Sequence, residues 1–269
     1  MSYAGVDLAT YGLHVTEYSV PEMAGIVFNK HSAIYGDSEF TTVNYSTRAI
    51  RVSCTVVATT KNQLQSYMDS IKGLVNPILT DKVITIDGID DRRFVGRLSE
   101  MTTPTAKGRW AFSFRMTFQC MAGLQSIDET NAAQSIATNP DTLTIPAPSG
   151  NVSRIPAELY IRNGTGAQLT SETITLANDT SNESIVWKGT IPDGYWLKFG
   201  TLDANGRHKS SIELSTTSGA DPEALTYTTA EIGYQSGDWA RLKGGTANDI
   251  TITGISTGTF EYTYRDRYL

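Results

Sequence analysis

Two stretches in the first half of the chain alternate between apolar and polar side chains, and this pattern limits the fold most. Residues 48–57 and 110–120 each place every second side chain on one apolar face, made by Ile50, Val52, Cys54 and Val56 in the first and by Phe112, Phe114, Met116, Phe118 and Cys120 in the second. The opposite faces are polar and carry Arg51, Ser53 and Thr55, and Ser113, Arg115, Thr117 and Gln119. A period of two is typical of a β-strand with one buried face. The chain therefore has to build a sheet whose apolar face is covered by another layer.

The segment after the first of these strands can supply that layer. Thr60 and Gln63 have the spacing of a helical capping box, and Gly73 and Pro77 end the pattern. Between them, apolar side chains at helical spacing predict about four turns of helix with one apolar face, formed by Leu64, Tyr67, Met68, Ile71, Leu74 and Val75. Short strand patterns at 83–86 and 94–98 follow. We predict an α+β domain in which one helix packs on a mostly antiparallel sheet.

Two other segments lack a regular apolar pattern. Residues 30–47 are polar and alternate only weakly, so we expect a long hairpin or arm that finds its inner face on a neighbouring subunit. Residues 126–150 are small and polar and end in Pro146, Pro148 and Gly150, which predicts a linker with a short helix near residues 132–136. The expected domains are residues 1–139 and 151–269, with the linker at about 126–150.

The second half shows short strand patterns up to its end. Residues 256–258 predict a closing hairpin between the last two patterns, and Asp221 followed by Pro222 predicts the start of a short helix. This spacing of short strands is typical of a β-sandwich. Apolar and polar side chains alternate at 159–162, 173–176, 185–187, 195–199, 212–214, 250–255 and 260–264.

Charge and composition exclude several classes of protein. The net charge is −6; residues 1–139 carry 12 basic and 13 acidic side chains, and the rest carry 10 and 15. Neither part has the basic excess that is typical of a nucleic-acid-binding protein. All apolar runs are far shorter than the roughly 20 residues of a membrane-spanning helix. The start lacks a basic and then apolar segment, so we expect no signal peptide and folding in the cytosol.

Two acidic segments are candidate cation sites. Asp87, Asp90 and Asp91 lie close together, but the two arginines that follow them offset the carboxylates, and a hard cation needs several oxygen ligands at one point. We interpret this segment as a solvated turn. Residues 203–206 resemble half of a calcium loop but lack the distant bidentate glutamate. Their Asn-Gly pair instead predicts a hairpin turn.

The sequence offers no recognisable catalytic motif. It contains no phosphate-binding loop or dinucleotide-binding glycine motif. His14, His31 and His208 lie far apart without metal-ligand spacing, and Cys54 and Cys120 lie on apolar strand faces, where buried reduced thiols are favoured over a disulfide. We therefore predict no catalytic residue, no metal and no cofactor. A pair of hydrolytic carboxylates among the 28 acids is an alternative that no motif supports.

Aromatic side chains gather in the second half, at Trp187, Tyr195, Trp196 and Trp239. Exposed aromatic rings can stack on the faces of sugars, which would give a carbohydrate-binding site. The more common role of such residues in a sandwich is in the core or at a subunit interface, and we favour that interpretation.

Several stretches together resemble one known family. They are residues 4–8 and 11–13 at the start, the strand at 48–52 with its following helix and the strand at 108–120, the stretch from Trp239 through Leu242 and Asn248 to Ile250, and residues 261–265. Their order and spacing resemble the distal tail protein family of bacteriophages with long non-contractile tails. The turn at 244–248 is longer than the usual Pro-Gly-x-Asn of that family.

The resemblance implies a structural role in the virion. Members form a hexameric ring at the far end of the tail tube, in which a tube-like N-terminal domain builds the ring and a galectin-like C-terminal sandwich faces outward. The ring joins the tail tube protein to the tail-tip hub and holds receptor-binding or fibre proteins, while DNA passes through the lumen without specific binding. Such a protein is assembled in the host cytoplasm. A closed ring needs complementary interfaces and no catalytic pocket.

Three hypotheses follow from the sequence. The first is the ring-forming distal tail protein, which is not an enzyme. The second is a carbohydrate-binding adhesin module of a phage tail tip, which rests on the aromatic residues of the second half. The third is a hydrolase that uses unrecognised carboxylates.

Overall fold

The structure is a computed structural model that describes residues 1–21, 26–32, 38–45, 47–76, 78, 81–89, 91–120, 124–150, 154–203, 208–230, 233–237 and 241–268. The chain divides into two compact units, residues 1–125 and 126–268, which we call unit 1 and unit 2. Within the described ranges, no helix has the length and apolar character of a membrane span.

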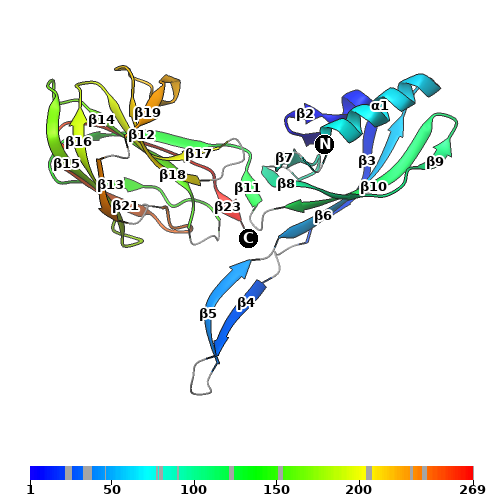
Figure 1. Ribbon diagram of the computed structural model, residues 1–269, viewed down its shortest axis with the longest axis horizontal. Coiled ribbons are helices and arrows are strands. Elements are labelled where there is room, and N and C mark those ends of the chain that lie inside the picture. The colour runs from blue at the N-terminus through cyan, green and yellow to red at the C-terminus, as the bar shows by residue number, and fades with distance from the viewer. Residues whose placement is uncertain are drawn as a thin grey trace. The chain divides into compact units, whose positions relative to one another are not determined.

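Unit 1 is built on one sheet with antiparallel pairing along its main path (Figure 1). The 3-10 helix η1 (Leu8–Tyr11) connects its first strands, β9 (Thr105–Gly108) pairs with β10, and β11 (Leu124–Ser126) pairs with β8. The spatial order of the main strands is β2 (Val6–Asp7), β1 (Ser2–Tyr3), β7 (Lys82–Thr85), β8 (Arg92–Met101), β10 (Ala111–Cys120), β6 (Arg48–Val57) and β3 (Leu13–Ser19).

The two alternating stretches form strands, as predicted, and the structure places these strands next to each other near the centre of the sheet. Strands β6 and β10 pair along their whole lengths, with Cys54 opposite Phe114 and Ile50 opposite Phe118. Their apolar side chains are buried in the core of unit 1, except that Phe112 is half-buried. The polar side chains lie on the opposite face of the sheet because successive residues of a strand point to opposite sides.

The predicted helix is α1 (Lys61–Leu74), and it covers the apolar face of the sheet. The Thr60 hydroxyl accepts a hydrogen bond from the backbone N–H of Gln63 at 3.2 Å, as a capping box requires. The Gln63 side chain reaches one residue further back and accepts from the N–H of Thr59 at 2.9 Å. Leu64, Met68 and Ile71 are buried in the core, so the helical spacing of the apolar residues is confirmed.

The segment predicted as an arm contains a hairpin. Strand β4 (Ile26–Ser32) pairs antiparallel with β5 (Ser38–Tyr45), and these two strands form a sheet of their own. Residues 33–37, between these two strands in the sequence, lie outside the described residues. Contact of this arm with a neighbouring subunit stays a prediction.

Unit 2 is a β-sandwich, as predicted. A single core cluster takes apolar side chains from both sheets, including Leu159 and Phe260 from one and Ile174 and Ile252 from the other. One sheet has the order β12 (Thr130–Ile136), β22 (Gly258–Tyr264), β14 (Ala157–Asn163), β17 (Trp196–Leu202), β18 (His208–Ser215) and β19 (Tyr227–Thr229). The second has the order β13 (Asp141–Ile145), β21 (Asn248–Thr253), β15 (Leu169–Asn178), β16 (Glu183–Ile191) and β20 (Tyr234–Gly237), and β23 (Arg267–Tyr268) ends the chain.

The linker expected at 126–150 contains strands instead. Residues 132–136, expected to be helical, belong to β12, and residues 141–145 form β13. Each is an edge strand of one sheet of the sandwich. Each buries one large apolar side chain, Ile136 and Ile145 respectively, so the sequence shows too little apolar alternation to mark a strand. The boundary of the compact units consequently lies at residue 125, before this segment.

The predicted closing hairpin is also wrong. Strands β21 and β22 belong to different sheets of the sandwich. The chain crosses between the sheets after Gly254, whose φ of 91° is in the left-handed region, and buries Ile255 in the core. The short helix after Asp221 is confirmed as the 3-10 helix η2 (Pro222–Ala224), with the Asp221 carboxylate accepting from the N–H of Glu223 at 3.0 Å.

Candidate functional site

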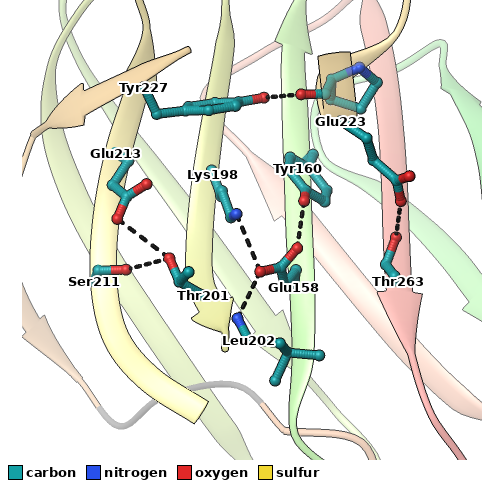
Figure 2. A network of polar contacts seen from close by, with 11 residues as sticks. Glu158, Tyr160, Lys198, Thr201, Leu202, Ser211, Glu213, Glu223, Tyr227 and Thr263 are labelled. Carbon is teal, nitrogen blue, oxygen red and sulfur yellow. Dashed lines mark hydrogen bonds and ion pairs between the residues drawn. The ribbon is translucent and has the colours of Figure 1, made fainter. Parts of the chain in front are cut away.

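The outer face of the six-stranded sheet of unit 2 contains a buried polar network (Figure 2). On β14, Leu159 and Ile161 enter the sandwich core, whereas Glu158 and Tyr160 lie on the other face. On β17 the alternation places Lys198 on this outer face beside β14. Glu158 and Tyr160 are nevertheless buried, with exposed fractions of 9% and 2%.

The segment between β18 and β19 is fastened to this outer face. The indole N–H of Trp196 donates to the backbone oxygen of Gly219 at 3.0 Å, and the Tyr227 hydroxyl donates to that of Pro222 at 2.9 Å. The Thr263 hydroxyl on β22 donates to the Glu223 carboxylate at 2.9 Å. These contacts hold η2 against the sheet.

Glu158 is the centre of the network. Its Oε1 accepts from the N–H of Leu202 at 2.5 Å and lies 3.0 Å from Nζ of Lys198, and its Oε2 accepts from the Tyr160 hydroxyl at 2.5 Å. Nζ of Lys198 also lies 5.3 Å from the centroid of the Tyr160 ring and 5.5 Å from that of Tyr227. The ammonium group thus has one carboxylate and two aromatic faces as partners, which offsets part of its desolvation.

Burial and the surrounding carboxylates together shift the pKa values of the network. Burial first, and then the charge of Glu158, raise the pKa of Tyr160 above its ordinary value. Burial and Glu158 likewise raise the pKa of Tyr227, so both hydroxyls stay protonated donors. Burial also raises the pKa of Glu261, and the nearby charges of Glu223 and Asp221 raise it further. A hollow of about 350 Å³ lies beside the network.

Sequence reasoning missed this network, although a signal for it is present. Glu158 lies inside the apolar run 157–161, and Lys198 lies inside the run 196–199. Charged residues are almost never fully buried unless they are paired, so two opposite charges in two apolar strands indicate a pair. The contacts of Glu158 and Lys198 are internal to the sheet, and those of Tyr227 and Thr263 fasten η2 to it, which is a structural role.

The aromatic residues proposed for sugar binding are not available for stacking where the structure describes them. Trp187 and Trp196 are buried, with exposed fractions of 3% and 1%. The indole N–H of Trp187 donates to the backbone oxygen of Ala230 at 2.7 Å. Tyr195 is half-buried against the core, and Trp239 lies outside the described residues. The adhesin hypothesis therefore loses two of the residues on which it depended.

The residues considered for metals are not brought together. Asp87 accepts from the amino group of Met1 at 2.7 Å, Asp91 is exposed, and Asp90 lies outside the described residues. Residues 204–207 also lie outside them, although the pairing of β17 with β18 confirms the hairpin. Across the part of the chain that the structure describes, no group of three or more His, Cys, Asp or Glu side chains could hold a metal ion.

The remaining candidates are His14, His31 and His208 and the two cysteines. His14 is exposed on β3, and the side chains of the other two histidines lie outside what the structure describes. Cys54 and Cys120 are buried free thiols, and burial raises the pKa of each to about 12. The expectation of buried reduced thiols is confirmed.

Comparison with known proteins gives matches by structure. No protein-family model matches the sequence, and no curated protein matches it. The chain is similar over 99% of its length, and over 98% of the other chain, to the Dit (gp 19.1) protein of SPP1, a paradigm of the hub adsorption apparatus in phages that infect Gram-positive bacteria. The TM-score is 0.69 and the sequence identity is 15%.

Two structures of the phage P2 baseplate in its activated conformation also match. They share 12% identity with the chain and cover 97% of it and 92% of the other chain, with TM-scores of 0.50 in the form with Sr and 0.47 in the form with Ca. The likeness to SPP1 Dit shows that the fold of this chain is that of a phage hub protein. The expected fold class, mainly β with one packed helix, is confirmed, and the galectin-like character of unit 2 stays a prediction.

Proposed function

We propose that this protein is a structural component of a bacteriophage tail tip, a distal tail protein whose copies close into a ring between the tail tube and the host-adsorption apparatus. The observation that carries the proposal is the fold similarity to the SPP1 Dit protein, which spans 99% of this chain and 98% of that one. Because both compact units are included, the similarity involves the whole arrangement of elements along the chain.

The proposal assigns different roles to the two units. Unit 1 builds the ring, and unit 2 faces outward and carries the receptor-binding or fibre proteins. A cyclic ring requires two different, complementary surfaces on each subunit. Unit 1 offers the two-stranded arm β4–β5, which pairs with no other described strand, and the edge strand β3, which has a paired neighbour on one side only. Such edges are suited to contact with a second chain.

The partners follow from this position. The last ring of the tail tube protein lies on one side, the tail-tip hub lies on the other, and DNA passes through the lumen without sequence-specific binding. The protein is assembled in the host cytoplasm, functions in the virion and is not an enzyme.

The mass of the purified protein in solution tests this proposal, with electron microscopy of the same sample. We expect ring-shaped particles of six subunits, alone or after addition of the tube and hub proteins. A variant in which residues 22–46 are replaced by a short Gly-Ser linker should remain folded but fail to form rings, because β4 and β5 pair only with each other among the described strands. A strict monomer that stays monomeric with both partners would overturn the proposal.

A further inference from the structure

Strand β12 is the longest edge strand described in the sandwich, and its free edge lacks the usual protection against a further strand. It has seven residues, whereas the edge strands β13, β19 and β20 have five, three and four. Natural proteins protect edges with short strands, charged side chains, prolines or bulges. Pro140 and Pro146 flank β13 directly. The sequence of β12, TNAAQSI, has no charged residue and no proline, and β12 pairs with β22 without a bulge.

The phase of the hydrogen bonds identifies the backbone groups at this edge. The N–H of Gly164 donates to the backbone oxygen of Thr257 at 3.1 Å, and this pair continues the register of β14 with β22. Because the bonded pairs of an antiparallel ladder alternate, the odd-numbered residues of β22 bond to β14 and the even-numbered ones bond to β12. The register of β12 then places the N–H and C=O groups of Asn131, Ala133 and Ser135 on the free edge.

These backbone groups are accessible to another chain. Asn131, Ala133 and Ser135 are exposed, and their short side chains allow a second backbone to approach. Among the described strands, β12 pairs with β22 alone. The next N–H in the same phase, that of Ala137, donates to the Asp141 carboxylate at 2.7 Å. The chain thus covers the edge where β12 ends and leaves it open along the strand.

An extended polypeptide is the ligand that matches such an edge. An added strand satisfies a row of free N–H and C=O groups with its own backbone, and these main-chain hydrogen bonds supply the affinity of β-augmentation. An apolar contact is available at one end of the edge. Ile127, shortly before β12, is 41% exposed, and among the described residues of unit 2 no other large apolar side chain is exposed.

The charge of unit 2 indicates which kind of strand would bind. Unit 2 contains 17 acidic and 10 basic side chains, a net charge of −7, whereas unit 1 contains 11 acidic and 12 basic ones. Near the edge, Asp128 is exposed shortly before β12, and Glu261 lies opposite Ala133 on β22. The basic Arg265 at this end is paired with Glu129 at 2.7 Å. Complementary charge favours a strand with lysine or arginine side chains, and like charge disfavours a nucleic acid or a second copy of unit 2.

We propose that the free edge of β12 binds an extended, lysine- or arginine-containing segment of another tail-tip protein as an added strand. The inference rests on the proposed function, in which unit 2 carries further proteins, and it names the backbone groups that would hold one of them. Two β12 edges can pair with each other only about a two-fold axis. Neighbouring copies in a closed ring are instead related by rotation about the ring axis, so they do not compete for this edge.

Hydrogen exchange of the full-length protein tests the inference, read by mass spectrometry on fragments that cover β12. The probes are two synthetic peptides of equal length, one of alternating threonine and lysine and one of alternating threonine and glutamate. The lysine peptide should slow exchange of the amides of Asn131, Ala133 and Ser135 about tenfold or more. The glutamate peptide should leave them unchanged, and added salt should weaken the effect of the lysine peptide.

Two substitutions at one position separate the backbone donor from the side chain. Ala133→Pro removes the central N–H of the free edge and keeps the ladder to β22, because proline is tolerated where the N–H of an edge strand faces solvent. It should abolish the protection by the lysine peptide. Ala133→Val keeps the N–H and is the matched control, so it should retain the protection.

Three results would overturn the inference. The first is no protection of β12 in the wild type with the lysine peptide, and the second is equal protection by the glutamate peptide or in A133P. The third is protection of β12 in the protein alone that rises with its concentration, which would assign the edge to a second copy. Failure of the ring proposal is seen separately, as a monomeric mass of the wild type.

Discussion

The side-chain amide of Asn178 donates a hydrogen bond to Oδ1 of Asn248 at 3.0 Å, and both residues are fully buried. Asn178 ends β15 and Asn248 begins β21, the neighbouring strand. Nδ2 of Asn178 also donates to the backbone oxygen of Arg241 at 2.5 Å, and Nδ2 of Asn248 donates to those of Lys243 and Thr246, each at 3.0 Å. The pair thus fastens residues 241–247 to the sandwich, which gives a structural reason for an asparagine immediately before this apolar strand.

Replacement of Asn248 by alanine should destabilise unit 2 strongly. In the wild type the backbone N–H of Lys243 donates to Oδ1 of Asn248 at 2.7 Å. The variant leaves this N–H and the backbone oxygens of Lys243 and Thr246 without their hydrogen-bond partner. Unsatisfied buried groups each cost about 1–3 kcal/mol, so we expect a loss of about 3 kcal/mol in the free energy of unfolding measured with urea. Asn131→Ala, at an exposed position of β12, is the matched control and should change it by less than about 0.5 kcal/mol. Equal effects of the two substitutions would contradict the prediction.

The buried pair of Glu158 and Lys198 gives a second prediction. Lys198→Met leaves the Glu158 carboxylate, whose side chain is 12% exposed, without its cation, and we expect a loss of about 3 kcal/mol in the free energy of unfolding. The double variant E158Q/K198M removes both charges, so it should be more stable than K198M alone. A double-mutant cycle measures this coupling.

Lys188→Met, on the exposed side of β16, is the control for the removal of a lysine charge. It should be nearly neutral in the same urea experiment. If K198M matched K188M, Glu158 and Lys198 would not be coupled.

The strands with one wholly apolar face were predictable from the sequence, and the edge strands were not. Strands β6 and β10 bury four side chains each, and this repetition is visible as a period of two. Strand β12 buries only Ile136, and its pairing with β22 depends on the partner strand rather than on its own apolar pattern. Local composition therefore favoured a linker there.

Periodicity also does not reveal the sheet to which a strand belongs. Strands β21 and β22 both alternate clearly, and a turn sequence separates them, so a hairpin was the natural prediction. Their apolar faces instead meet across the sandwich core, where Ile252 and Phe260 belong to one cluster. The polar residues of β6 and β10 were visible in the sequence as the alternate set, but their neighbours on the adjacent strands, such as Glu17 opposite Ser53 and Glu100 opposite Thr117, could be seen only once those strands were placed.

The carboxylates on the outer face of unit 2 predict a pH-dependent gain from Glu261→Gln. Burial first, and then repulsion from Glu223 and Asp221, raise the pKa of Glu261 above its ordinary value of 4.5. The contribution of Glu261 to the free energy of unfolding is therefore most favourable at a pH below the ordinary pKa. It is lost as the pH rises through the higher pKa of the folded state. E261Q should raise the midpoint of thermal unfolding at pH 7 and leave it nearly unchanged at pH 4. Glu172→Gln, at an exposed position of β15, is the control, and an equal gain in both variants would show that only net charge matters.

The two thiols of unit 1 give the last prediction. Burial raises the pKa of Cys54 and of Cys120 from 9.0 to about 12, and the thiolate is the form that reacts with alkylating agents. At pH 8 the native protein should therefore resist iodoacetamide, whereas the urea-unfolded chain should take up two groups, as mass spectrometry would record. Because the folded-state pKa is raised, the stability that the protonated thiols contribute is complete below pH 9 and is lost as the pH rises towards 12. The variant C54A/C120A should lose less stability over that interval than the wild type. The pH dependence of stability that Tyr160 and Tyr227 contribute should be the same in both proteins. Rapid alkylation of either thiol in the native protein at pH 8 would show that the apolar face of β6 and β10 opens to solvent.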